Sequence, residues 1–120
     1  MVEGDGYAVA NVDALADGPG FRKIRRALGV TAFGVNAVVL PPGYSTGRHY
    51  HERQQELYLV LDGEIEFDLA GEKRTLGPGG LVRVDAPIVR SLRNTSGEAE
   101  ATYLCVGAAG GYVGRDGVLP

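Results

Sequence analysis

Two histidines and a glutamate are the side chains of this sequence best suited to chemistry. His49 and His51 are the only histidines in the chain, and Glu56 follows five residues later. In an extended strand, residues two apart point to the same face, so the two imidazoles lie side by side while Tyr50 points away. Imidazole nitrogens and a carboxylate oxygen are suited to a divalent transition metal such as Fe²⁺, Mn²⁺, Ni²⁺ or Zn²⁺. The spacing therefore predicts a metal site formed by His49, His51 and Glu56.

Two other interpretations of these residues stay open. A carboxylate that enters an apolar interior is costly unless it is paired or coordinated, and a salt bridge would satisfy Glu56 as well as a metal would. An isolated histidine pair in a strand is also compatible with two hydrogen-bonded core residues. Tyr58 shares the parity of Glu56, so its hydroxyl is a candidate ligand contact. Gln55 is either a contact at the start of this strand or a hydrogen-bonding group that reaches the pocket.

Short apolar runs separated by turn residues must position these side chains. The chain has 19 glycines and 6 prolines, which fall between runs of strand length. This punctuation is typical of an all-β sandwich or barrel and leaves little room for helices. The predicted strands are Thr31 to Leu40, Glu56 to Leu61, Glu64 to Leu69, Leu81 to Asp85, Val89 to Arg93 and Ala101 to Val106.

The clearest local unit is the segment 57–69. Asp62-Gly63 stands between two β-rich runs, which predicts a tight hairpin, because the favoured two-residue turns need positive φ. In the second run, acidic residues alternate with Ile65, Phe67 and Leu69. The acids should therefore face solvent and the apolar residues the core. Later in the chain, Arg83 and Asp85 have the spacing of a surface ion pair.

The two ends of the chain carry weaker signals. Residues 1–30 are predicted to form outer strands, with Asn11 capping a short helical turn. The basic segment 21–26 is either a solvated strand edge or a patch for an anion or a partner. The glycine-rich tail 107–120 is either a frayed end or a flap over the mouth of the fold, and the sequence favours neither.

Composition narrows the function classes. A chain of 120 residues with 44% hydrophobic and 22% charged residues is typical of one globular domain, so we expect a single domain over 1–120. No apolar run is long enough to cross a bilayer, and a net charge of −3 argues against nucleic-acid binding. The one cysteine, Cys105, cannot form an intramolecular disulfide, and its apolar neighbours predict strand packing. Together with the absence of an export signal, this favours the cytoplasm.

The residues around the histidines also follow a known pattern. Gly43, five residues, His49 and His51, four residues, Glu56, six residues and Gly63 resemble the first motif of the cupin superfamily at every fixed position. The second cupin motif is matched at Pro78-Gly79-Gly80. The resemblance covers residues 43–94 and implies a single-domain jelly-roll β-barrel, often a homodimer, with ligands from both motifs in one pocket.

The second motif departs from the family at the residue that matters most. Where cupins usually supply a further histidine ligand followed by an asparagine, this chain has Arg90 and Asn94. A guanidinium is always charged and has no lone pair to donate, so it cannot be a metal ligand. The departure leaves two possibilities for Arg90.

In the first hypothesis, His49, His51 and Glu56 hold a metal and Arg90 binds the carboxylate of a small-molecule substrate, as in a small metalloenzyme whose reaction the sequence does not specify. In the second, Arg90 pairs with Glu56 in place of the metal, and the chain is a metal-free module that binds a small organic anion. The candidate ligand contacts are Arg90, Tyr58 and Gln55. Metal content separates the two hypotheses.

Overall fold

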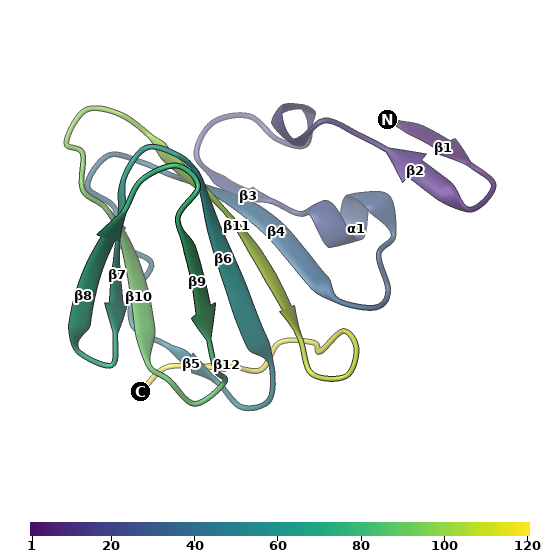
Figure 1. The fold of residues 1–120 in the computed structure, drawn as a ribbon. Coiled ribbons are helices and arrows are strands. Elements are labelled where there is room, and N and C mark those ends of the chain that lie inside the picture. Colours follow the sequence, from purple (N-terminus) through teal and green to yellow (C-terminus); the bar gives the residue numbers. More distant parts are fainter.

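The computed structural model describes residues 1–120 and consists mostly of β-strands (Figure 1). In chain order the elements are β1 (Val2–Gly4), β2 (Tyr7–Val9), η1 (Val12–Ala14), β3 (Gly20–Arg22), α1 (Ile24–Leu28), β4 (Gly34–Leu40), β5 (Tyr50–His51), β6 (Gln55–Asp62), β7 (Ile65–Leu69), β8 (Glu72–Leu76), β9 (Leu81–Val84), β10 (Arg90–Asn94), β11 (Ala101–Ala108) and β12 (Gly117–Val118). The predicted strands are all present, with shifted ends, and η1 begins after Asn11 as predicted.

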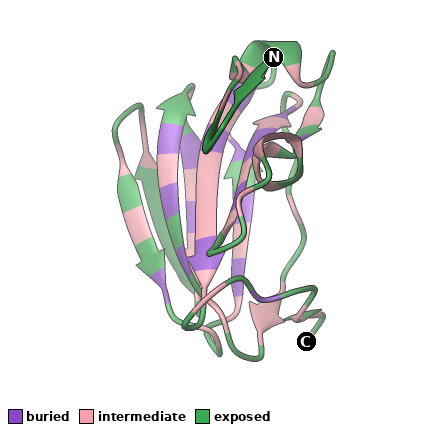
Figure 2. Cartoon of the chain, turned by 90° about the vertical axis from the view of Figure 1, so that its right-hand side faces the viewer, coloured by how far each residue is buried: buried purple, intermediate pink, exposed green.

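The strands form two main sheets rather than one closed barrel. A five-stranded sheet has the order β3-β4-β11-β6-β9, a three-stranded sheet the order β10-β7-β8, and β5 and β12 form a separate pair. Both main sheets contribute to one core, whose buried residues are Val38, Leu40, Tyr58, Val60, Ile65, Phe67, Val84, Leu92, Ala101 and Tyr103. Figure 2 shows the buried positions on these strands and the exposed ones on the outer segments. This is the jelly-roll arrangement of two packed sheets.

The predicted hairpin at Asp62-Gly63 is wrong. β6 pairs with β11 and β9, whereas β7 pairs with β10 and β8, so the chain crosses between the sheets at Gly63, where φ is +74°. The tight hairpin is instead β7–β8, whose turn residues Ala70 and Gly71 both have positive φ. The prediction missed β8 because most of its residues are exposed and polar, and without a buried face no apolar alternation appears.

The N-terminal region contains more than the outer strands predicted for 1–30. β1, β2 and β3 are present, but the basic segment continues from β3 into α1. Arginine, alanine and leucine favour a helix, and Gly29 ends it in the left-handed conformation, with its N–H donating to the carbonyl of Arg25. The helix lies against β4, beside the five-stranded sheet (Figure 1).

The asparagine of the second motif holds loops together. The side chain of Asn94 is fully buried, and its Nδ2 donates to the carbonyl oxygens of Leu40, Pro41 and Ala99 at 3.2, 3.1 and 2.8 Å. Its Oδ1 accepts from the backbone N–H of Ser96 at 3.0 Å. The amide therefore satisfies backbone groups from two segments that approach each other at one end of the fold.

No helix in the structure has the length and apolar character needed to span a bilayer. The homodimer, the cytoplasmic location and the single-domain organisation stay predictions.

Candidate metal and ligand site

The predicted metal ligands come together at the end of the fold where β5 and β6 begin. His51 lies in β5, Glu56 in β6, and His49 just before β5, where its backbone pairs with Arg90 through two hydrogen bonds of 3.0 and 2.8 Å. One ligand atom from each of His49, His51 and Glu56 lies within 4.8 Å of the other two. The two imidazole rings meet edge to face, with centroids 5.3 Å apart.

Glu56 is a buried carboxylate with several partners. Its Oε1 accepts a hydrogen bond from the Tyr58 hydroxyl at 2.6 Å, and its Oε2 accepts one from the thiol of Cys105 at 3.3 Å. The Nε2 of His51 lies 3.3 Å from Oε1. Burial raises the pKa of Glu56, but hydrogen bonds from His51, Tyr58 and Cys105 outweigh it and lower the pKa to about 2. Glu56 is therefore ionised at neutral pH.

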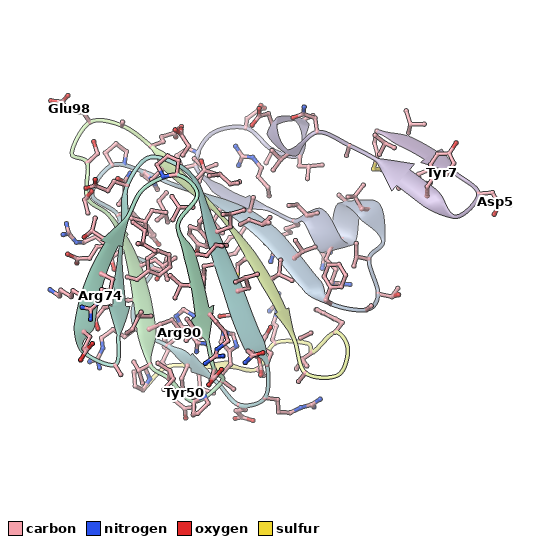
Figure 3. All side chains as sticks on the ribbon, in the orientation of Figure 1. Asp5, Tyr7, Tyr50, Arg74, Arg90 and Glu98 are labelled. Carbon is pink, nitrogen blue, oxygen red and sulfur yellow. The ribbon has the colours of Figure 1, made fainter.

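Arg90, which Figure 3 labels, is fully buried and lies beside this carboxylate. Its Nη2 is 3.6 Å from Oε1 of Glu56 and donates to the carbonyl of Asp85 at 3.3 Å, while Nη1 donates to the carbonyl of Ala86 at 3.2 Å. Its Nε has no hydrogen-bond partner. The guanidinium is thus held between a loop backbone and Glu56, and it does not line the cavity described below.

The two histidines have different surroundings. Burial lowers the pKa of His49, whose imidazole has the carbonyl of Gly47, 3.4 Å from Nδ1, as its hydrogen-bond neighbour. Its imidazole is neutral at physiological pH and free to donate a lone pair. The pKa of His51 is raised, because Glu56 faces Nε2 on one side of the ring and Asp116 faces Nδ1 on the other.

Asp116 is the residue of the site that the sequence did not reveal. It comes from the C-terminal segment, where β12 pairs with β5 so that Gly117 lies opposite His51. Its Oδ1 is 2.7 Å from Nδ1 of His51. The only sequence signal was an acidic side chain inside a glycine-rich tail. The tail is therefore docked beside the histidines rather than frayed.

The two neighbouring glutamines point in different directions. Gln55 is exposed and donates to the Asp85 carboxylate at 2.7 Å, away from the cavity. Gln54 instead lines the cavity and donates to Asp116. Gly107, opposite Glu56 on β11, leaves room for the Gln54 side chain, because a Cβ there would collide with Oε1 of Gln54. Neighbouring residues of an extended segment point to opposite sides. Because Gln55 points outward, Gln54 before it points toward the cavity.

A cavity of about 950 Å³ opens from these residues. The buried Tyr58 is among its lining residues, and the cavity continues to the segment around α1. Its basic lining residues are Lys23, Arg25, Arg26 and Arg115, and its acidic ones are Glu56 and Asp116. Both acids contact His51, whereas none of the four basic side chains has a carboxylate within 4.0 Å. The mouth is therefore positively charged although the chain carries a net charge of −3.

The donor set fits a divalent transition metal. Two imidazoles and one carboxylate, close together and open to a cavity, form the two-histidine, one-carboxylate arrangement that leaves coordination positions for a ligand. The surface pair Arg83–Asp85, predicted from spacing, is confirmed at 3.4 Å and lies outside this cavity.

Comparisons with known proteins agree with this architecture. A curated relative, the oxalate-binding protein of Thermotoga maritima, is 36% identical over 67 residues, which are 56% of this chain and 54% of the relative. The chain thus spans about half the length of the curated relative that it matches. A crystal structure of a cupin protein from Bacteroides fragilis superposes with a TM-score of 0.74 over 97% of this chain and 98% of that chain, at 24% identity. This likeness shows the fold alone.

A second solved structure is more similar in sequence. The sugar phosphate isomerase from a cupin superfamily of Silicibacter pomeroyi is 31% identical, with a TM-score of 0.70 over 85% of this chain and 68% of that chain. The family model described as the cupin domain matches residues 36–107, which include both motifs and every predicted metal ligand. The chain therefore belongs to the cupin family.

Proposed function

We propose that this protein binds a divalent transition metal through His49, His51 and Glu56 and binds a small organic anion beside it. The observation that carries the proposal is the convergence of two imidazoles and an ionised carboxylate within 4.8 Å at one cavity. A bound metal would act as a Lewis acid toward a carboxylate or hydroxyl group of the ligand.

The surrounding residues hold the donors in place. Tyr58 donates to Oε1 of Glu56, and Cys105 donates to Oε2, so the carboxylate is fixed from two sides. Arg90 lies 3.6 Å from the same carboxylate and anchors it to the loop that carries Asp85. Arg90 thus contacts Glu56 rather than the cavity, and this favours a role in fixing the carboxylate over direct contact with a ligand.

The charge of the cavity favours an anionic ligand. Lys23, Arg25, Arg26 and Arg115 lie at its mouth without carboxylate partners, so their field attracts anions. A named relative binds oxalate, a small dicarboxylate, and the metal would supply the second point of attachment. We therefore infer a carboxylate-bearing small molecule as the ligand, held between the metal and the basic mouth.

One observation favours a second candidate function, a metal-free module for the same anions. Glu56 is the one carboxylate among the three donors, and its ion pair with Arg90 already neutralises its charge. A metal is therefore not required for charge balance. In this case the basic mouth alone would bind the anion.

Calorimetric titration with oxalate separates the two candidates. The protein is stripped with a chelator, divided, and one half is reloaded with Mn²⁺ or Zn²⁺ before the titration. The first proposal predicts that oxalate binds the loaded protein at least about tenfold more tightly, and that His49→Ala abolishes the difference. Equal affinity in both halves would favour the metal-free module.

A further inference from the structure

The C-terminal strap, residues 109–118, is built onto the site at three points. Val113 is buried, and the ring of Tyr112 lies under the guanidinium of Arg25, with 4.0 Å between the guanidinium carbon and the ring centroid. β12 then pairs with β5, which contains His51. These contacts fix the position of Asp116 between Tyr112 and β12.

Hydrogen-bond donors surround both oxygens of the Asp116 carboxylate. Oδ2 accepts from the backbone N–H groups of Arg53 and Gln54 at 2.8 and 3.0 Å. Oδ1 accepts from Nε2 of Gln54 at 2.5 Å and lies 2.7 Å from Nδ1 of His51. An ionised carboxylate has only acceptors, so the hydrogen between Asp116 and His51 must be on Nδ1 of the histidine.

This assignment decides what the other nitrogen of the ring can do. When Nδ1 carries the hydrogen, the lone pair of a neutral imidazole is on Nε2. Nε2 of His51 is the nitrogen that faces Glu56, at 3.3 Å. The ring is thus oriented with Nε2 toward the other predicted ligands. When Nε2 is protonated it donates to Glu56, and in the neutral Nδ1–H form its lone pair is available there to a metal. In metalloproteins, carboxylates that accept from a ligand histidine in this way contribute strongly to metal affinity.

We propose that Asp116 is a positioning residue that holds His51 as the Nδ1–H form, with Nε2 directed at the metal, so that the C-terminal strap sets the metal affinity of the site. The affinity part rests on the proposed function. The part that concerns the imidazole does not, because the hydrogen bond forms without a metal.

Asp116→Asn is the sharpest test, because it changes one atom and reverses the hydrogen bond. Two backbone N–H groups need an acceptor, so the amide oxygen of the new side chain takes the place of Oδ2. Its NH₂ group then faces Nδ1 of His51, which becomes an acceptor and places the hydrogen on Nε2. A protonated Nε2 cannot bind a metal.

The first measurement is a titration of the chelator-treated full chain with Co²⁺, followed by visible absorption. We expect Asp116→Asn to weaken Co²⁺ binding by about 10- to 100-fold. Glu52→Gln is the matched control, because it removes one negative charge from an exposed side chain in the turn after β5. The Co²⁺ affinity of Glu52→Gln should stay within about twofold of that of the wild type. Equal weakening in both variants, or none in Asp116→Asn, would overturn the proposal.

The second measurement is the ¹⁵N chemical shift of the imidazoles in the metal-free chain, at a pH where both rings are neutral. The chain has only two histidines, and a His49→Gln variant assigns their signals. We expect His51 to be protonated on Nδ1 in the wild type and on Nε2 in Asp116→Asn. The same tautomer in both would refute the role of Asp116. Failure of the wild type to bind Co²⁺ would instead refute the metal site, while this spectrum would still decide on Asp116.

Discussion

Replacing Arg90 by methionine tests how the buried guanidinium supports the site. The change removes two charge-assisted hydrogen bonds, to the carbonyls of Ala86 and Asp85, each worth about 1.5 kcal/mol at the low end. It also removes the cation 3.6 Å from Glu56, which adds about 1 to 2 kcal/mol, because that carboxylate keeps other partners. Removing the buried Nε, which has no hydrogen-bond partner, should stabilise the fold by about 1 kcal/mol. The expected net loss in the free energy of unfolding is about 3 to 4 kcal/mol.

The assay is urea unfolding of the chelator-treated protein, followed by circular dichroism, with the free energy of unfolding obtained by linear extrapolation. Arg83→Met is the matched control, because Arg83 also pairs with a carboxylate but its side chain is 72% exposed. Arg83→Met should lower the free energy of unfolding by less than about 1 kcal/mol.

A double-mutant cycle with Glu56→Gln isolates the ion pair from the hydrogen bonds. The coupling between Arg90→Met and Glu56→Gln should be about 1 kcal/mol, since the second change removes the charge that the first leaves unpaired. A stability of Arg90→Met within about 0.5 kcal/mol of the wild type, or a cycle without coupling, would refute this reasoning.

Three further predictions concern the fold and the cavity mouth. Gly63→Ala should cost about 3 kcal/mol in urea unfolding, because φ is +74° and the new Cβ would lie 2.8 Å from the Cβ of Ala101. Asn94→Asp should cost about 4 kcal/mol in the same assay, since it places a buried carboxylate oxygen against three carbonyl oxygens. Lys23→Ala combined with Arg26→Ala should weaken oxalate binding, measured by calorimetry, by roughly three- to tenfold at low salt.

Two of these predictions have a control within the chain. Gly71 also has positive φ, but a Cβ added there would meet no atom within 4 Å, so Gly71→Ala should cost only about 1 kcal/mol. Equal losses at both glycines would contradict the packing argument. Lys73→Ala with Arg74→Ala removes two positive charges from β8, away from the cavity, and should leave oxalate affinity within about twofold. A variant Asn94→Asp as stable as the wild type would contradict the hydrogen-bond assignment.

Much of the site could be predicted because its residues are close in sequence. His49 and His51 are two apart, and Glu56 begins the next strand, so strand parity alone placed them on one face. Parity also placed Tyr58 beside Glu56, where it donates a hydrogen bond. Strand patterning worked equally well for β7, whose residues alternate between core and surface as predicted.

The residues that could not be predicted depend on contacts between distant segments. Asp116 is 65 residues from His51, and the contacts of the C-terminal strap, among them the pairing of β12 with β5, bring the two residues together. Asp62-Gly63 has the composition of a hairpin turn, but the next strand pairs in the other sheet, and turn chemistry does not determine which strand a neighbour joins. The outward orientation of Gln55, by contrast, follows from strand parity once Glu56 points inward, so the sequence contained the signal.

The central claim is that the three donors bind a metal, and elemental analysis of protein purified without chelator or affinity metal tests it most directly. We expect close to one transition-metal ion per chain in the wild type and loss of that metal in His49→Ala. A wild type that carries no metal and takes none up on dialysis, while Arg90→His gains a stoichiometric ion, would contradict the claim. That result would assign the cavity to anions alone, with Arg90 in place of the metal.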